Sequence, residues 1–236
     1  MGSARQRMKA RSINAEDLSA LPLLAGLSST ARQKLIADGR ICCYKPSEFI
    51  AFEGDPIDEA LLLLKGGVVV SRVSMDGREQ ILERLERGAL INLTALLTQN
   101  YPCFTAQVRA SGQTEILKFP IALFWQFIRT EPRFTQELLC HLAGRDAALL
   151  ELAASLSLSD VRCRLAACLI RHAGSNAGPG FTQAEIAAEI GTVREVVARL
   201  LREFEDQGWL IRVHHEIRLR DRLALEALAG GSHWGA

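Results

Sequence analysis

Three charged side chains, Arg194, Glu195 and Arg199, have the types and spacing that suit recognition of base edges in DNA. An arginine can donate two hydrogen bonds to O6 and N7 of a guanine, and a glutamate can accept one from N4 of a cytosine. On a helix, all three would point outward from its first turns, where a recognition helix meets the major groove. Glu195 and Arg199 are also an i,i+4 pair, which alone would stabilise a solvated helix face by about 0.3 kcal/mol.

The residues before this helix favour the DNA interpretation. Thr182 can cap a first helix, and Glu185 can complete a capping box three residues later. Ala187 is small enough to let two helices cross closely, and Gly191 suits the turn between them. Apolar faces follow at Ile186, Ile190, Val197 and Leu200. The sequence therefore predicts a helix-turn-helix, and we assign to DNA contact Thr182, Gln183, Arg194, Glu195 and Arg199.

The segment after the second helix predicts a wing. Glu205 to Gly208 end the helix, and two short strands are expected at Trp209 to Val213 and His215 to Leu219. From Asp160 onward, ten arginines are matched by ten acidic residues, so this region has no net charge to attract DNA. The prediction of DNA binding rests on pattern and not on net charge.

The composition limits the class of protein. The chain has 236 residues, 48% of them hydrophobic, and no uninterrupted apolar run of 18 residues, so we expect a cytoplasmic protein that does not enter a membrane. Residues 1–11 are basic but lack a following apolar stretch, which argues against a secretory signal. No nucleophile–base arrangement, phosphate loop or metal-ligand spacing stands out in the sequence, so we expect no enzyme activity and assign no metal ligand.

The six cysteines show no Cys-x-x-Cys pair, and the adjacent Cys42 and Cys43 have poor geometry for zinc. In the cytoplasm they should be reduced thiols. Packing roles are expected for the three in apolar helical stretches, Cys140, Cys163 and Cys168. A functional role remains open for Cys42, Cys43 and Cys103.

The N-terminal part of the sequence shows a different pattern, in which turn residues recur at regular intervals. Between Ile41 and Phe119, turn signals recur every 11 or 12 residues, at Gly54, Gly66–Gly67, Gly77 and Gly88. Short strands between such turns indicate an antiparallel sandwich or barrel, whose interior could hold one small ligand. Asp17 to Gly39 should form short helices, with Pro22 to Leu27 as a loop between them.

A long helix should follow Pro132. Its seam is spaced 4, 3, 4, 3 and 4 residues apart, at Leu138, Leu142, Arg145, Leu149, Leu152 and Leu156. This heptad pattern favours a parallel coiled coil between two copies of the chain, and the alternative is packing against the chain's own barrel. A homodimer would place two recognition helices on successive major grooves of an inverted repeat. Ser159 or Asp160 should cap the next helix, Val161 to His172.

In this order of parts the chain resembles the family of the cyclic-AMP receptor protein and the fumarate-nitrate regulator (CRP/FNR). The resemblance covers about residues 20–225 and is most specific from Thr182 to Gly208. It implies an α+β fold with a jelly-roll sensor domain (residues 1–130), a dimerisation helix (131–158) and a winged helix-turn-helix (159–236). Arg194, Glu195 and Arg199 match the cyclic-AMP receptor branch, which implies TGTGA-like half-sites in double-stranded DNA and RNA polymerase as a partner. The fumarate-nitrate branch has an apolar residue in place of Arg194 and a serine in place of Ala198.

The sensor domain departs from the cyclic-nucleotide pattern of the family. Members that bind cyclic AMP carry Gly-Glu and Arg-Ser or Arg-Thr where this chain has Ile91–Asn92 and Phe104–Thr105. These differences remove the two charged contacts to the ribose and the cyclic phosphate, so a cyclic nucleotide is not expected. A small, fairly apolar organic effector is expected instead, with a pocket at Asn92, Tyr101, Cys103, Phe104 and Thr105.

Other effectors remain alternatives at this stage. The iron–sulfur members of the family have a cysteine cluster near the amino terminus, and residues 1–40 contain no cysteine. A haem would need an axial ligand, yet no histidine precedes His141, which leaves Cys103 or the Cys42–Cys43 pair. Thiol redox sensing, a regulator without an effector, and a module that binds proteins instead of DNA also stay open.

Overall fold

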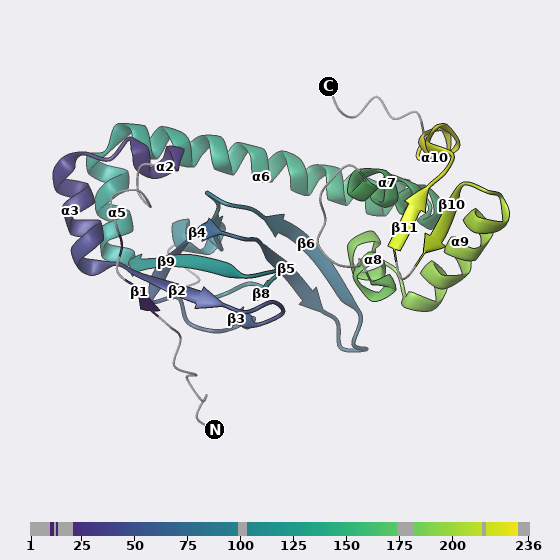
Figure 1. Ribbon diagram of the computed structural model, residues 1–236. Coiled ribbons are helices and arrows are strands. Elements are labelled where there is room, and N and C mark those ends of the chain that lie inside the picture. Colours follow the sequence, from purple (N-terminus) through teal and green to yellow (C-terminus); the bar gives the residue numbers. More distant parts are fainter. Residues whose placement is uncertain are drawn as a thin grey trace. The chain divides into compact units, whose positions relative to one another are not determined.

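The structure is a computed structural model that describes residues 10–11, 13, 21–98, 103–173, 182–213 and 216–230. The chain divides into two compact units (Figure 1). The N-terminal unit comprises residues 1–72 and 83–148, and the C-terminal unit comprises residues 73–82 and 149–236. The expected fold class, α+β with a sheet-rich first part, a long helix and a helix-turn-helix, is confirmed.

Two sheets form the framework of the N-terminal unit (Figure 1), although Val73 of β5 and residues 79–82 of β6 are grouped with the C-terminal unit. The first has the strand order β1-β2-β9-β4-β7 and the second the order β3-β8-β5-β6. The pairs β2–β9, β4–β9 and β5–β8 are antiparallel. The strands are β1 (Ala10–Arg11), β2 (Arg40–Tyr44), β3 (Phe49–Ala51), β4 (Glu59–Lys65), β5 (Val68–Val73), β6 (Glu79–Leu85), β7 (Leu90–Ile91), β8 (Gln107–Ala110) and β9 (Thr114–Pro120).

Strand β4 shows why the first sheet is covered on both faces. Its residues 60–64 are an uninterrupted apolar run, and every one of them is buried. Successive side chains of a strand point to opposite faces, so an exposed face would need alternating polar residues. In the neighbouring strands, Leu117 of β9 lies between Ile41 of β2 and Leu62 of β4, and all three side chains are buried. This row contributes to the core of the unit.

The glycines predicted to make turns do so. Gly54, Gly66, Gly77 and Gly88 have φ values of 87°, 78°, 80° and 95°. Positive φ is unfavourable for residues with a Cβ atom. At Gly66 a Cβ would also lie 2.3 Å from the carbonyl oxygen of Gln113, so this position requires glycine on steric grounds as well.

The expected loop at Pro22 to Leu27 is wrong in part, because Pro22–Ala25 forms helix α2. Pro22 is the first helical residue, where its fixed φ is suitable and its missing N–H costs nothing. The other helices of this unit are α3 (Ser29–Asp38), α4 (Leu93–Leu97) and α5 (Ile121–Thr130). Phe124 and Phe127 of α5 pack edge-to-face against the buried ring of Phe134, with ring centroids 6.1 and 5.5 Å apart.

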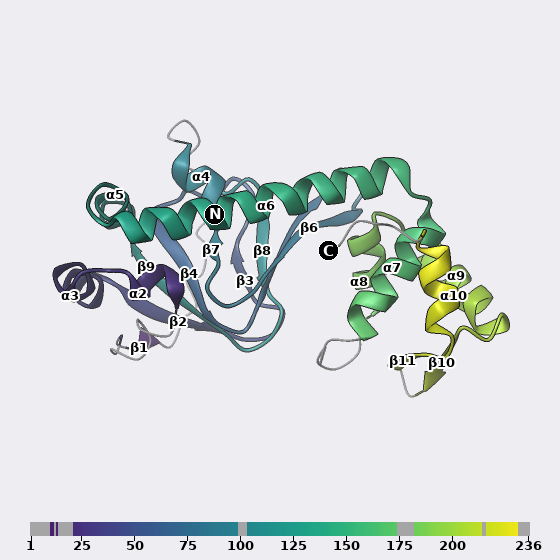
Figure 2. The ribbon, with the colours of Figure 1, turned by 90° about the horizontal axis from the view of Figure 1, so that it is seen from above.

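Helix α6 (Pro132–Leu158) begins where the sequence predicts and is continuous (Figure 2). Its expected coiled-coil seam is corrected at Leu138, which is 3% exposed and belongs to the core of its own unit. Leu142 packs against the same core, and Arg145 binds groups of the N-terminal unit. This first part of the seam therefore follows the alternative of packing on the chain's own barrel. Further along, Leu149 is exposed and Leu152 is half-buried.

Besides residues 73–82 and the end of α6, the C-terminal unit is built from helices and one hairpin. Its elements are α7 (Val161–Ala173), α8 (Gln183–Ile190), α9 (Arg194–Asp206), β10 (Leu210–Val213), β11 (Glu216–Leu219) and α10 (Arg222–Leu228). They share a second core that includes Leu165, Ile186, Leu201, Phe204 and Leu225, all fully buried. In the part of the chain that the structure describes, no helix has the length and apolar character needed to cross a membrane.

Candidate nucleic-acid interface

Helix α8 begins with the capping box that the sequence predicts. The Glu185 backbone N–H donates to Thr182 Oγ1 at 3.2 Å, and the Thr182 N–H donates to Glu185 Oε2 at 3.0 Å. Two backbone donors at the start of the helix are thus satisfied by two side chains. At the other end, Gly191 has φ 67° and ψ 48°, and its N–H donates to the Ala187 carbonyl. The left-handed conformation makes the turn toward α9.

Buried apolar side chains lock α8 and α9 together. Ile186 and Val197 are fully buried, and Ile190 and Leu200 are 2% and 4% exposed. Ala187 is 4% exposed, which agrees with its expected place where the two helices cross. With this face of α9 committed to the core, its opposite face is presented to solvent.

The three proposed base-reading residues lie on that outer face. Arg194, Glu195 and Arg199 are all exposed, and α9 begins at Arg194. Among the described residues, no salt bridge is found between Glu195 and Arg199. Thr182 is exposed and Gln183 is half-buried at the start of α8. The structure thus brings all five residues to one helix-turn-helix.

Two arginines on α7 hold this motif in ways that the sequence did not reveal. Arg164 Nε donates to the Ile190 carbonyl oxygen at 2.8 Å and so satisfies a free acceptor at the end of α8. Arg162 forms an ion pair with Glu203 of α9 at 2.7 Å. These contacts join residues 26 and 41 positions apart, and no local pattern marks such pairs.

The wing is present as predicted, within one residue at each described boundary. Strands β10 and β11 pair antiparallel, with Leu210 opposite Leu219 and Val213 opposite Glu216. Arg212 of β10 forms an ion pair with Glu205 of α9, and this hydrogen bond holds the pKa of the Glu205 carboxyl below its usual range. The expected start of the second strand at His215 lies outside the described residues. The hairpin is therefore tied directly to the helix that it follows.

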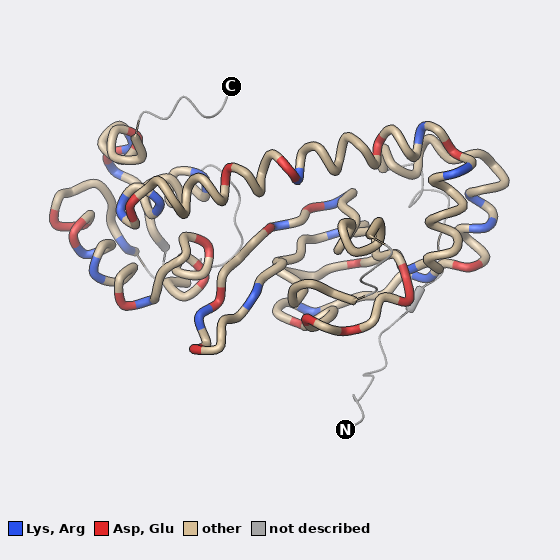
Figure 3. Tube along the Cα trace, turned by 180° about the vertical axis from the view of Figure 1, so that it is seen from behind, with Lys and Arg blue, Asp and Glu red and all other residues tan. Residues whose placement is uncertain are grey.

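Charges of both signs occur along the C-terminal unit, as Figure 3 shows for α9. The exposed charged residues of α9 carry both signs, in agreement with the balanced composition of this part of the sequence. A surface of this kind gives little long-range attraction to phosphates. Any preference for DNA must come from the placement of individual side chains.

Of the five residues expected around an effector, three lie next to one another, one is in the core and one lies outside the described residues. Asn92 has a left-handed backbone, with φ 56° and ψ 38°, and its Nδ2 lies 3.5 Å from the Cys103 carbonyl oxygen. Thr105 Oγ1 lies 3.5 Å from Asn92 Oδ1, so these three residues are neighbours. Phe104 is 5% exposed and belongs to the core of the unit. Tyr101 lies outside the described residues.

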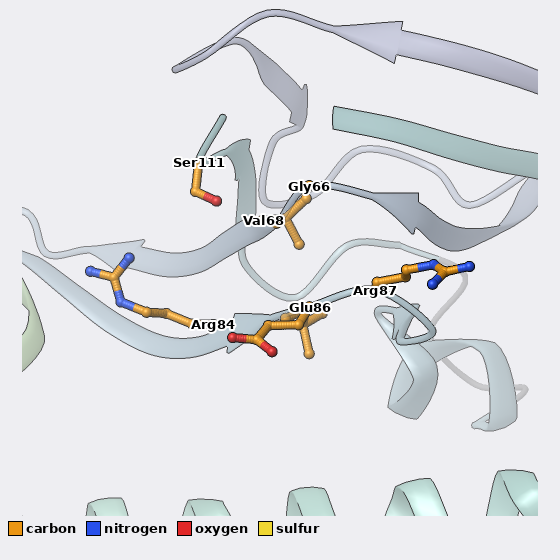
Figure 4. A pocket seen from close by; sticks show the side chains of 8 residues that line it. Gly66, Val68, Arg84, Glu86, Arg87 and Ser111 are labelled. Atoms are coloured by element: carbon orange, nitrogen blue, oxygen red, sulfur yellow. The ribbon is translucent and has the colours of Figure 1, made fainter. Parts of the chain in front are cut away.

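A pocket of about 360 Å³ lies elsewhere in the N-terminal unit (Figure 4). Its lining comes from the turn between β4 and β5, the end of β6 and Ser111. Arg87 points away from the labelled side chain of Arg84, and its Nε donates to the Leu64 carbonyl at 3.1 Å. Because one of the two guanidiniums is held by the backbone, this pocket lacks a converging pair of cations for an anion.

Comparison with known proteins identifies the class. Residues 41–131 match the family model of the cyclic nucleotide-binding domain, and residues 163–228 match that of the Crp-like helix-turn-helix domain. Together with the fold described above, these matches show that the chain belongs to the CRP/FNR family of transcription regulators.

Individual relatives are distant. The cAMP-activated global transcriptional regulator CRP of Escherichia coli O6:H1 is 28% identical over 179 residues, which cover 72% of this chain and 84% of that protein. The transcriptional activator protein anr of Pseudomonas aeruginosa is 24% identical over 232 residues, or 92% of each chain. A solved crp/fnr-family regulator from Eubacterium rectale has a TM-score of 0.75 and 22% identity over 89% of this chain and 98% of its own.

Proposed function

We propose that this regulator binds inverted-repeat DNA as a homodimer and reads TGTGA-like half-sites with α9. The single observation that carries the proposal is the exposed row of Arg194, Glu195 and Arg199 on a helix whose opposite face is buried. A rigidly seated helix can hold these groups at base edges without a further ordering cost. Thr182 and Gln183 would contact the DNA from the start of α8, with Gln183 as the donor to phosphate oxygens, because Glu185 already accepts from the N–H and the hydroxyl of Thr182.

The dimer surface that we propose is revised from the sequence-based seam. On α6 a different row of small and apolar residues is exposed, with spacings of 4, 4 and 3, at Leu139, Ala143, Ala147 and Leu150. Leu139 and Leu150 are 60% and 66% exposed, and with the alanines between them they form one apolar strip of the kind that marks an interaction surface. Small residues between them would let a second α6 approach closely.

We propose further that the effector is not a cyclic nucleotide. We align Phe104, which is buried in the core, with the arginine of cyclic-AMP-binding members, and Asn92 with their glutamate. An apolar ring and a neutral amide offer no charged partner to a cyclic phosphate or charged acceptor to a ribose hydroxyl. Among the relatives, CRP is described as cAMP-activated, whereas the global nitrogen regulator of Nostoc and anr are named without cyclic AMP. The family therefore leaves room for an effector of another kind. RNA polymerase remains the expected protein partner.

The test of base reading compares arginine variants on changed DNA. Arg194→Ala and Arg199→Ala should each weaken binding to a TGTGA-type inverted repeat by about 1–3 kcal/mol. Each variant should also lose its preference at one guanine, because a bidentate contact is made to that base alone. Equilibrium binding to a set of single-base substitutions, measured for wild type and both variants, would resolve the two effects.

Arg129→Ala serves as the matched control, since Arg129 is an exposed arginine at the end of α5 in the other unit. It should bind every sequence in the set like the wild type. If Arg194→Ala and Arg199→Ala instead weaken all sequences equally, these residues contact phosphates and the proposed base reading is wrong.

A further inference from the structure

A group of three different metal-ligand types lies in the C-terminal unit, behind the helix-turn-helix. Cys168 and His172 are one turn apart on α7, and Glu189 lies on α8. The ligand atoms of the three side chains all lie within 4.8 Å of one another. A thiol, an imidazole and a carboxylate from two helices thus converge on one point.

The contacts at this point are short. Glu189 Oε1 lies 2.9 Å from His172 Nε2 and 3.5 Å from Cys168 Sγ. Cys168 is fully buried, and the side chains of His172 and Glu189 are 23% and 12% exposed. All three side chains are thus largely desolvated, and each carries an electron pair that a cation could accept.

We propose that Cys168, His172 and Glu189 bind a divalent transition-metal ion of the zinc class. Zinc accepts thiolate sulfur, imidazole nitrogen and carboxylate oxygen together, whereas magnesium and calcium take oxygen ligands. The i,i+4 spacing of Cys168 and His172 places both on one helix face, the spacing that also serves pairs of zinc-binding histidines on helices. Three protein ligands leave the fourth tetrahedral position to a water molecule.

The geometry requires only small side-chain movements. Bonds of about 2.0–2.3 Å to a tetrahedral ion place its donor atoms roughly 3.3–3.8 Å apart. The three donor atoms now lie at most 4.8 Å apart, so rotation about side-chain bonds can bring them to the separation that the ion requires. Both helices can keep their packing while the ion enters between the three donors.

Arg171 is the group that the ion would displace. Its guanidinium lies 3.1 Å from Glu189 Oε1, but its side chain is 61% exposed and can turn to solvent. Cys168 binds as the thiolate and releases its proton to water, while His172 binds as the neutral imidazole.

A metal here would connect α7 to the first helix of the helix-turn-helix. Binding to the folded state alone raises its stability by mass action. The ion would thus stabilise the position of α8, and through it that of α9, by a free energy that grows with the logarithm of the free metal concentration above the dissociation constant. This role is independent of the identity of the effector and of the DNA sequence that is read.

Cobalt titration of the full-length, metal-free protein tests the proposal. Cobalt(II) substitutes for zinc and gives a near-ultraviolet sulfur-to-cobalt charge-transfer band when a thiolate is a ligand. We expect a band that saturates at one ion per chain and that zinc abolishes. Cys168→Ser should eliminate it, and Cys163→Ser, a cysteine substitution on the same helix, should retain it in full.

His172→Asn and Glu189→Gln provide variants that do not alter the fully buried cysteine. Each should weaken zinc binding by more than about tenfold in calorimetry, with an unchanged circular dichroism spectrum. The proposal is overturned if no charge-transfer band forms, if the band survives Cys168→Ser, or if both variants bind zinc like the wild type. Failure here would leave the DNA proposal intact, because DNA binding is measured separately.

Discussion

At the scale of single residues, Asp160 shows how one side chain defines the start of a helix. The Cys163 backbone N–H donates to Asp160 Oδ1 at 2.9 Å, which caps α7 as one of the two predicted residues. The same hydrogen bond holds the pKa of the Asp160 carboxyl below its usual range. A lowered pKa means that the ionised form is favoured in the folded state, so stability depends on pH.

Asp160→Ala should lower the free energy of unfolding of the C-terminal unit by about 1 kcal/mol at neutral pH. The difference between wild type and variant should be constant above the unfolded pKa of about 3.9 and shrink as pH falls through the lowered folded value. Urea unfolding followed by Trp209 emission, with Trp125 and Trp234 replaced by Phe, measures it. Asp160→Asn keeps a neutral cap, so a similar pH dependence in that variant would contradict the assignment.

The residues at the expected nucleotide position lead to a second prediction. Hydrogen bonds to charged groups typically contribute about 1.5–3 kcal/mol each, so their loss at Asn92 and Phe104 should remove micromolar affinity for cyclic AMP. Calorimetry with cyclic AMP and cyclic GMP should show no binding at micromolar ligand, and neither should change DNA affinity. Tight binding of either nucleotide would show that these positions were aligned wrongly with the family pattern.

At the scale of elements, α6 is fixed to the N-terminal unit by a half-buried ion pair. Arg145 donates to Glu83 Oε2 of β6 at 2.5 Å and to the Leu90 carbonyl oxygen at 3.1 Å. Burial raises the pKa of the Glu83 carboxyl even though Arg145 acts in the opposite direction. Burial thus disfavours the ionised form of Glu83 more than the attraction to Arg145 favours it, which makes the pair a weak source of stability.

Removing only Arg145 from the ion pair with Glu83 should lower the free energy of unfolding more than removing both residues. Arg145→Met leaves Glu83 partly buried without its cation and should cost about 1–3 kcal/mol of unfolding free energy, while Arg145→Met with Glu83→Leu should recover most of that loss. Because the raised pKa of Glu83 disfavours its charge, the single variant should lose stability as pH rises through that pKa. Thermal unfolding of the three proteins across pH measures this, and an equally unstable double variant would contradict it.

Elements with strong local signals could be predicted from sequence. The capping box at Thr182 and Glu185, the turn at Gly191 and the periodic burial of α9 are set by neighbours, and each is found. The seam on α6 was misassigned at Leu138 because a leucine repeat fits a partner helix and the chain's own sheet equally well. The Cys168, His172 and Glu189 cluster escaped notice because Glu189 comes from another helix and no Cys-x-x-Cys spacing marks it.

At the scale of the whole molecule, two units with separate cores occur in one chain. Helix α6 contributes residues to both, and its exposed leucines offer the surface that we propose for a second copy. Two copies would supply two α9 helices to a DNA site with twofold symmetry. The proposed homodimer would thus recognise both half-sites of an inverted repeat, which together specify more base pairs than one half-site does.

Spacing between half-sites tests this central claim most directly. Affinity at fixed salt should be compared for a TGTGA inverted repeat with half-site centres about one helical turn apart, and for the same half-sites separated by about half a turn more. A dimer that reads successive major grooves should lose at least about tenfold in affinity when the second half-site rotates to the far side of the duplex. Equal binding to both DNAs, or no preference over a scrambled sequence, would contradict the account.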